Sequence, residues 1–369
     1  MAEQVFRFAD DLGPVKIVHI HRPALDLKAI VVVDNVAAGP AIGGTRMALD
    51  VSLEECVRLA RAMTFKNAAA GLPHGGAKSV IFGDPAMAPQ RKEEIVRAFA
   101  CAIGDVTDYI AGPDMGTDET AMAWIKDEIG RSVGLPEEIG GIPLDEIGAT
   151  GFGLAIAAEV AQDFSDVKLD GARVVVQGFG SVGKHAARFL ADRGARLVGA
   201  SDSQSAIADP SGLEVDELIR IKNEGRAVAD YDPGQKLARD AVVEIPCDIW
   251  IPAARPDVIS ADNVGQLDCR IVLQGANIPV TAEAETMLHA RDILVVPDFI
   301  ANAGGVICGA VEYHGSTRAT AFATIEEKIR ANTADVLRAA KEQTIAPRAA
   351  AMELAERRVR RAMAVRRWW

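Results

Sequence analysis

The chain has few of the residues that hold small secreted folds or metal sites together. Its 369 residues include five cysteines, and no two of them form a Cys-x-x-Cys pair. An odd, scattered set argues against a disulfide framework and a zinc site, and is typical of a reducing cytoplasm. The six histidines show no His-Glu-x-x-His pattern. We therefore predict that no metal is bound.

Long hydrophobic runs and excess positive charge are also missing. No apolar run approaches the roughly 20 residues that a membrane-spanning helix needs. Residues 1–6 lack a basic stretch followed by an apolar core, so we expect no signal peptide. A net charge of −12 predicts that the molecule repels nucleic acid and anionic membranes. We expect a cytoplasmic protein with neither of these as a partner.

The C-terminal end departs from this acidic character. Residues 357–369 hold six arginines and two tryptophans, a composition that would suit nucleic acid or an anionic membrane surface. However, Val359, Met363 and Val365 follow a spacing that fits a helix packed on its own protein or on a neighbouring subunit. We favour the packed helix, given the acidic remainder of the chain.

Strands and helices alternate along the chain, and its length suggests two domains. Regular β-α-β alternation implies a mostly parallel sheet covered by helices. We predict an α/β protein with an N-terminal α/β substrate domain at 1–146 and a Rossmann doubly wound dinucleotide-binding domain at 147–319, with a cleft between them. A helical segment at 320–369 is expected to pack back across this cleft.

A glycine-rich turn between a predicted strand and helix indicates the cofactor. In the Gly-x-Gly-x-x-Gly pattern, Gly178 permits a tight turn, Gly180 lets a pyrophosphate approach the backbone, and Gly183 allows close helix–strand packing. Ser181 and Val182 begin the helix, whose N–H groups suit phosphates. The alternative is a Rossmann-like domain that binds nothing.

The residue at the end of the next predicted strand favours NAD over NADP. The Asp202 carboxylate is placed to accept hydrogen bonds from the adenosine ribose hydroxyls, and it would repel a 2′-phosphate. No Arg or Lys follows within Ser203–Ser205. We therefore predict NAD as the cofactor.

Three ionisable residues in the N-terminal half are candidates for the chemistry. Lys66 lies in an apolar helical run and Lys78 follows a Gly-Gly pair; a buried lysine needs a partner anion or a lowered pKa. One lysine would bind a substrate carboxylate, and the other would assist proton transfer. Asp114, on a glycine-bracketed loop after a strand, completes an acid–base pair. The alternative is that both lysines are ordinary surface residues.

Several short segments, in this order, carry a family resemblance: Gly43–Met47, Lys66–Gly71, Gly75–Lys78, Gly112–Thr117, Ala149–Gly153, the Rossmann glycines and Asn302–Val306. Together they resemble the glutamate/leucine/phenylalanine/valine dehydrogenase superfamily. The resemblance implies NAD(P)-dependent oxidative deamination of an L-amino acid to a 2-oxo acid and ammonia, the reverse reductive amination, and a homo-oligomer assembled through the N-terminal domain.

The resemblance also implies a role for each matched residue. Lys66 would bind the substrate α-carboxylate, and Gly44 would lie beside the substrate. Lys78 would activate water and Asp114 would be the general acid and base. The remaining residues, implied to bind the cofactor, are Thr150, Ala253 and Asn277.

Two departures from the glutamate enzymes predict a different substrate. Those enzymes have a lysine before the Gly-Gly pair and a serine late in the pocket, and here these positions are Ile42 and Gly309. Burying a side-chain carboxylate without them would leave an uncompensated charge. We therefore predict an apolar substrate of the leucine, valine or phenylalanine type. Ile42, Gly112, Val306 and Gly309 would wall its pocket, and the two glycines would leave room for a large side chain.

Two alternatives stay open. One is a glutamate dehydrogenase whose second carboxylate partner lies elsewhere, for example at Arg46; the other interpretation of Arg46 is an ion pair that supports its loop. The second alternative is a non-catalytic, NAD-binding regulatory protein. The presence of Lys66, Lys78 and Asp114 together argues against it, since a binding module needs no acid–base pair.

Overall fold

The structure is a computed structural model that describes residues 6–366. The chain divides into two compact units. Unit 1 comprises residues 1–143, 306–321 and 352–369, and unit 2 comprises 144–305 and 322–351. Both units are discontinuous in sequence, whereas each predicted range was continuous. Trp368 and Trp369, part of the arginine-rich end, lie outside the described residues.

Unit 1 is built on a five-stranded sheet with the order β1-β2-β4-β3-β5. Strands β1, β2 and β4 pair antiparallel, whereas β3 runs parallel to both β4 and β5. The sequence did not predict β3, because two glycines and an arginine have low strand propensity. The elements are β1 (Lys16–Arg22), β2 (Leu27–Asn35), β3 (Ala41–Ala48), α2 (Leu53–Ala69), β4 (Gly75–Phe82), α3 (Pro89–Ala102), β5 (Tyr109–Pro113), α4 (Glu119–Ile129) and α10 (Gly304–Tyr313).

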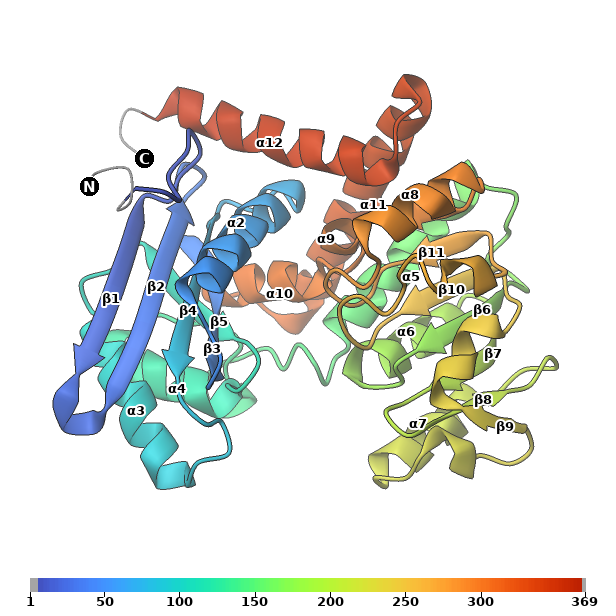
Figure 1. The fold of residues 1–369 in the computed structure, drawn as a ribbon, viewed down its shortest axis with the longest axis horizontal. Helices are drawn as coiled ribbons and strands as arrows, with labels where there is room; N and C mark the ends of the chain where they lie inside the picture. Colours follow the sequence, from blue (N-terminus) through green and yellow to red (C-terminus); the bar gives the residue numbers. More distant parts are fainter. Residues whose placement is uncertain (1–5, 367–369) are drawn as a thin grey trace. The chain divides into compact units, whose positions relative to one another are not determined.

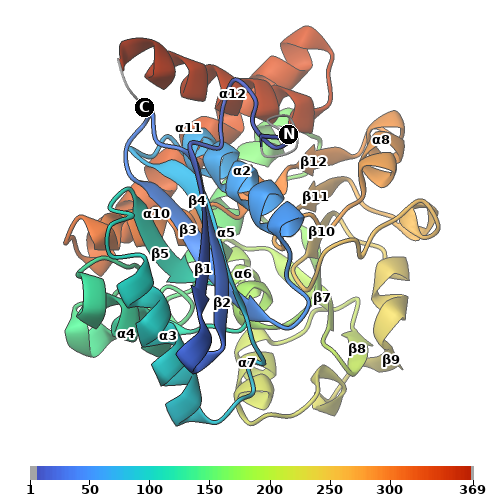
Figure 2. The ribbon, with the colours of Figure 1, turned by 60° about the vertical axis from the view of Figure 1, so that its left-hand side comes forward.

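Helices cover both faces of this sheet (Figures 1 and 2). Successive strand residues point to opposite faces. Accordingly Ile30 and Val32 of β2 join a core with α2, while Val31 and Val33 join a second core with α3 and α4. The central strands are therefore buried on both sides, and any polar residue on them needs a partner.

Unit 2 contains a seven-stranded sheet with the order β12-β11-β10-β6-β7-β8-β9. Its first five strands are parallel, and β8 and β9 continue the sheet antiparallel. This architecture confirms the predicted α/β fold with a Rossmann-type sheet. The elements are α5 (Ala149–Ala161), β6 (Arg173–Gln177), α6 (Ser181–Ala191), β7 (Arg196–Ser201), β8 (Ser205–Ala208), α7 (Val215–Asn223), β9 (Gln235–Ala238), β10 (Ile249–Pro252), β11 (Ile271–Leu273), α8 (Ala282–Ala290), β12 (Leu294–Val296) and α9 (Asp298–Ala301).

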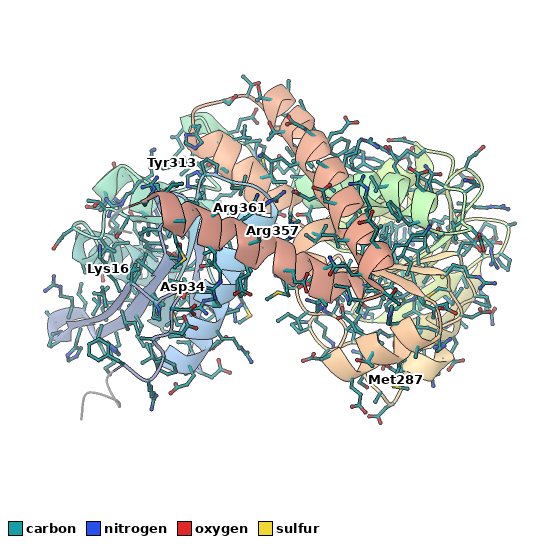
Figure 3. All side chains as sticks on the ribbon, turned by 90° about the horizontal axis from the view of Figure 1, so that it is seen from above. Lys16, Asp34, Met287, Tyr313, Arg357 and Arg361 are labelled. Carbon is teal, nitrogen blue, oxygen red and sulfur yellow. The ribbon has the colours of Figure 1, made fainter. Side chains whose placement is uncertain are left out.

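Two long helices end the described chain, α11 (Arg318–Gln343) and α12 (Pro347–Val365). Pro347 is the first residue of α12. The backbone N–H of the first residue has no partner within a helix, so a proline, which lacks this group, is tolerated there. In unit 1, Arg358 of α12 donates to the carbonyl oxygens of Ala68 and Ala69 at the end of α2. Figure 3 labels Arg357 and Arg361 on the same helix. Part of the arginine-rich segment thus packs on its own protein.

Candidate active site

The three parallel strands of unit 1 bring the predicted acid–base residues together. Strand β3 lies between β4, which carries Lys78, and β5, which Asp114 follows directly. The Lys78 Nζ donates a hydrogen bond to Asp114 Oδ2, and the two side chains are 4% and 19% exposed. The sequence suggested Lys78 and Asp114 only as a hypothetical acid–base pair. In the structure they are in direct contact across β3.

Gly44 of β3 provides the space for this ion pair. A Cβ atom on residue 44 would lie 2.8 Å from Asp114 Cβ and 3.0 Å from Lys78 Nζ. These separations are shorter than normal van der Waals contact, so a side chain here would push the pair apart. Gly44 therefore has a steric role beneath Lys78 and Asp114.

Arg46 holds the other oxygen of the same carboxylate. Its Nε donates to Asp114 Oδ1 at 3.1 Å, and its Nη1 donates to Glu55 of α2. The structure therefore bears out the interpretation of Arg46 as an ion pair that supports the Asp114 loop. Sequence analysis did not list Arg46 among the site residues, although the Gly-Gly-x-Arg spacing places it on the same face of β3 as Gly44.

Burial and charge make Lys78 a candidate base. Burial in unit 1, followed by the nearby positive charge of Arg46, lowers the pKa of Lys78 to about 7. The Lys66 charge acts in the same direction more weakly. A lysine with this pKa is partly deprotonated at neutral pH, so it can both accept and return a proton.

Lys66 lies in the last turn of α2, where it is half-buried. Helix α2 approaches β4 closely because Gly76 has no side chain; a Cβ there would lie 2.0 Å from the Thr64 nitrogen. The Asn67 side chain then donates to the carbonyl oxygens of Ile42 and Gly75. These contacts fix the end of α2 against β3 and β4.

Val133 lies beside two glycines of the predicted pocket wall. Cβ atoms on Gly112 and Gly309 would lie 3.3 Å and 3.6 Å from Val133 Cγ2. Val133 is therefore the side chain nearest to both glycines. Ile42 is buried and Val306 is half-buried. The room that the two glycines were expected to leave for a large substrate side chain stays a prediction.

Glu312 of α10 fixes the segment that carries Val133. Its carboxylate accepts hydrogen bonds from the backbone nitrogens of Gly134, Leu135 and Ile142. Burial raises the pKa of Glu312, although these N–H groups oppose that effect. The sequence indicated no role for this residue, because the backbone N–H groups that donate to it lie some 170 residues away.

In unit 2, the glycine-rich turn fits a dinucleotide. Gly178 has a φ of +96°, and a Cβ on Gly183 would lie 2.0 Å from the Gly178 carbonyl oxygen. By contrast, a Cβ on Gly180 would meet nothing within 4 Å, so this turn is open to a ligand. Gly180 is the N-cap of α6 and makes no side-chain cap. Its first N–H groups are suited to a pyrophosphate.

Other predicted cofactor residues lie around this turn and at the start of α5. Ser181 donates to the Asp145 carbonyl oxygen, and the Ala253 nitrogen donates to the Gln177 carbonyl oxygen directly before the turn. Val182, next to Ser181 in α6, is half-buried. A Cβ on Gly305 would lie 3.2 Å from Thr150 Oγ1, so Thr150 adjoins the end of the Asn-Ala-Gly-Gly segment.

The side chain of Asn302 contacts Asn277. Of these two residues, only Asn277 was assigned to the cofactor from the sequence. The Asn302 side-chain nitrogen donates to Asn277 Oδ1 at 3.1 Å and to the Ala276 carbonyl oxygen at 3.1 Å. The Asn302–Val306 motif was visible in the sequence, but nothing local indicated this contact. Asn302 therefore positions Asn277.

Asp202, directly after β7, has several hydrogen-bond partners within the protein. Its side chain accepts hydrogen bonds from three backbone nitrogens and from the Lys222 ammonium, at 2.7 Å. These contacts fix the carboxylate at the end of β7, and the role of Asp202 toward the ribose hydroxyls stays a prediction. The sequence indicated no role for Lys222 because it lies in α7, well beyond Ser203–Ser205, the residues considered after Asp202.

Residues 6–366 hold neither a membrane-spanning helix nor a group of side chains suited to a metal. No helix in that range combines the length and apolar composition that crossing a membrane requires. The same range contains no cluster of three or more His, Cys, Asp or Glu side chains suited to hold a metal ion.

Family models match both parts of the chain. Residues 17–131 match the Glu/Leu/Phe/Val dehydrogenase dimerisation domain, and residues 140–367 match the Glutamate/Leucine/Phenylalanine/Valine dehydrogenase model. These matches include Lys66, Lys78 and Asp114 in the first range and the glycine-rich turn in the second.

Individual proteins are similar over most of the chain. A glutamate dehydrogenase of Aeropyrum pernix is 36% identical over 90% of this chain and 85% of its own length. One of Thermotoga maritima is 40% identical over 76% of this chain and 70% of its own length. Among solved structures, a hetero-hexameric glutamate dehydrogenase from Thermus thermophilus (Leu bound form) has a TM-score of 0.86 at 29% identity, covering 96% of this chain and 91% of its own.

These relatives overturn the prediction of an apolar substrate. The curated proteins at 35–40% identity are named as glutamate dehydrogenases, which favours the alternative that the sequence left open. Their names include both NAD-specific and NADP-specific enzymes, so the family does not fix NAD as the cofactor. Overall similarity outweighs an argument from Ile42 and Gly309 alone, since that argument assumed that no other residue binds a side-chain carboxylate.

Proposed function

The chain belongs to the glutamate/leucine/phenylalanine/valine dehydrogenase family, and we propose that it is a glutamate dehydrogenase. The reaction converts L-glutamate, water and an oxidised nicotinamide dinucleotide into 2-oxoglutarate, ammonium, the reduced dinucleotide and one proton, and runs in reverse as reductive amination. The observation that carries the proposal is the similarity to glutamate dehydrogenases over up to 90% of the chain. The Lys78–Asp114 contact supplies the acid–base pair that this chemistry needs.

The charged residues of unit 1 each have a proposed role. Lys66 binds the α-carboxylate, for which the end of α2 offers a half-buried cation. Asp114, held between Lys78 and Arg46, accepts a proton from the substrate ammonium group. Arg46 orients Asp114 rather than binding substrate, because its guanidinium group is already paired with Asp114 and Glu55.

Oxidation at the α-carbon, for which a bound nicotinamide dinucleotide would supply the hydride acceptor, leaves a protonated imine. Neutral Lys78 then removes a proton from the water that attacks the imine carbon, so a C–O bond forms. Asp114 returns its proton to the nitrogen of the resulting carbinolamine. As the C–N bond breaks, the hydroxyl group loses its proton to Asp114 and becomes the carbonyl. Asp114 then passes this proton to the leaving ammonia, which departs as ammonium, and Lys78 releases the proton that it took from water. Both residues reverse these transfers in reductive amination.

In unit 2, the cofactor is held by the glycine-rich turn and the start of α6, with Thr150 and Asn277 toward the nicotinamide end. The open space over Gly180 supports this assignment. We further propose a homo-oligomer, supported by the match of residues 17–131 to a dimerisation domain. Light scattering on the purified protein measures its oligomeric state.

The direct test is a panel of twenty L-amino acids with NAD and with NADP at alkaline pH, followed by absorbance of the reduced nicotinamide. We expect the highest kcat/KM for L-glutamate, and reductive amination of 2-oxoglutarate by ammonium. D-Glutamate is the stereochemical control and should be inert. A higher kcat/KM for L-leucine or another apolar amino acid would show that the substrate assignment is wrong.

A further inference from the structure

The segment that follows β11 has a strained backbone at one residue. Ile278 has a φ of +48° and is 47% exposed. A β-branched residue rarely adopts this left-handed conformation, because its Cβ crowds the neighbouring carbonyl oxygen. Strain of this kind is found at functional sites, where surrounding contacts hold it in place. The segment also leaves the carboxyl end of a parallel strand, the edge at which open α/β sheets bind ligands.

Hydrogen bonds hold both polar backbone groups of Ile278. Its nitrogen donates to Asp298 Oδ2 at 2.8 Å, and its carbonyl oxygen accepts from the Asp257 nitrogen at 2.9 Å. Rotating φ to a negative value would turn these two groups relative to each other, so one bond would be lost. The two bonds together therefore favour the left-handed conformation over the ordinary one.

Asp298 is held in turn by Arg348. Asp298 begins α9 and is 6% exposed, and its Oδ1 accepts from Arg348 Nη2 at 3.0 Å. Arg348 lies in the first turn of α12 and also donates to both carboxylate oxygens of Glu285 in α8, at 2.5 Å and 2.9 Å. A planar guanidinium group with several fixed N–H directions can hold two carboxylates in one geometry. This arrangement leaves Oδ2 of Asp298 for the Ile278 nitrogen.

The other end of α9 holds the residues before Ile278. Asn302, directly after α9, donates to the carbonyl oxygens of Gly275 and Ala276, at 3.3 Å and 3.1 Å. It also donates to Asn277 Oδ1 at 3.1 Å. The short helix thus holds this segment at both ends. Asn277 lies between the two anchors, so the direction of its side chain depends on the backbone conformation at Ile278.

We propose that Asp298 is a positioning residue: held by Arg348, it keeps Ile278 in the left-handed conformation and so directs Asn277 toward the nicotinamide end of the cofactor. This inference rests on the proposed function, which assigns Asn277 to that end. Without the hydrogen bond from Ile278 to Asp298, the backbone would relax to a negative φ and turn Asn277 away. The start of α12 thereby supports the cofactor site through α9.

The test compares two ligands that differ at the nicotinamide end alone. Isothermal titration calorimetry measures the dissociation constants of the reduced dinucleotide with the higher kcat/KM and of the matching ADP-ribose, 2′-phosphorylated if that dinucleotide is NADPH. Asp298→Ala should weaken dinucleotide binding about tenfold, whereas binding of the ADP-ribose stays within about threefold. Asp248→Ala is the matched control and should change neither constant, because Asp248 pairs with Arg173 at the amino ends of the strands.

A second substitution separates positioning from general stability. Glycine adopts a positive φ without strain, so Asp298→Ala combined with Ile278→Gly should restore dinucleotide binding to within about threefold of the natural protein. Combining Asp298→Ala with Ile278→Val keeps a β-branched residue and should restore nothing. Circular dichroism checks that each variant is folded. If Asp298→Ala is not, Arg348→Met replaces it, with the same selective loss and the same rescue expected.

The outcomes distinguish this inference from the proposed function. Unchanged dinucleotide binding in a folded Asp298→Ala protein overturns the inference and leaves the dehydrogenase proposal intact. Equal loss for the dinucleotide and the ADP-ribose also overturns it, since a merely structural residue would affect both ligands. Rescue by glycine that is no better than rescue by valine overturns the role of the Ile278 backbone. A natural protein that binds neither NADH nor NADPH overturns both proposals together.

Discussion

Lys78 Nζ lies 3.0 Å from the position that a Cβ on Gly44 would occupy. The closeness follows from the sheet order, which places β3 between the strand that carries Lys78 and the strand that precedes Asp114. An ion pair that bridges two strands must pass over the one between them. The residue there has to be glycine for the two charges to meet.

Gly44→Ala should therefore inactivate the protein without unfolding it. The added methyl group separates Lys78 from Asp114, and misplaced acid–base groups cost about a hundredfold in kcat. Steady-state kinetics and circular dichroism measure the two effects. Gly43→Ala is the contrasting variant, since a Cβ there would lie 1.6 Å from the Ala77 carbonyl oxygen and should disrupt the sheet itself. Retention of full turnover in Gly44→Ala would contradict the steric role.

Removing the proposed base should abolish most of the turnover. Lys78→Met is expected to lower kcat by about a hundred- to ten-thousandfold, the usual contribution of acid–base catalysis. Lys78→Arg keeps the positive charge but cannot deprotonate near neutral pH, so we expect a loss of similar size. If Lys78→Arg kept turnover within about tenfold of the natural protein, Lys78 would act only through its charge.

The pH profile should follow the lowered pKa of Lys78, which is about 7. Below this pH the ammonium form predominates and cannot accept a proton, so kcat/KM for deamination falls as pH decreases. Above it the neutral amine predominates and the rate levels off. Arg46→Met removes a charge that lowers this pKa, so the acidic limb should move to higher pH. If the acidic limb of the profile stayed at the same pH in this variant, Arg46 would not influence the pKa of Lys78.

A lysine at residue 42 should improve the use of glutamate. Ile42 occupies the position at which the glutamate enzymes carry the lysine that pairs with the side-chain carboxylate. We expect Ile42→Lys to lower the KM for L-glutamate by about tenfold through a charged hydrogen bond, with kcat little changed. Ile42→Met, similar in size and uncharged, is the control. An unchanged KM in a folded Ile42→Lys protein would mean that residue 42 does not face the substrate side chain.

Much of the fold was accessible from the sequence because local patterns carry it. The glycine-rich turn, the capped start of α2 at Ser52 and the alternation of strands and helices all depend on neighbouring residues. Strand β3 was missed because Gly43, Gly44 and Arg46 disfavour a strand on their own, and its pairing with β4 and β5 overrides that propensity.

The substrate argument failed for a related reason. It assumed that the carboxylate partners absent at Ile42 and Gly309 are absent from the whole pocket. Similarity over the length of the chain carries information about substrate that two positions do not.

The order of residues along the chain by itself determined the family motifs, the glycine-rich turn and the identity of the ionisable groups. Only the tertiary structure decided which charges meet: Lys78 with Asp114 over Gly44, Arg46 with that same carboxylate, and Lys222 with Asp202. The physical reason is the distance along the sequence over which each property depends on other residues. Backbone conformation responds to adjacent residues, whereas the pKa and the ligand preference of a charged side chain depend on burial and on partners that folding brings from distant segments.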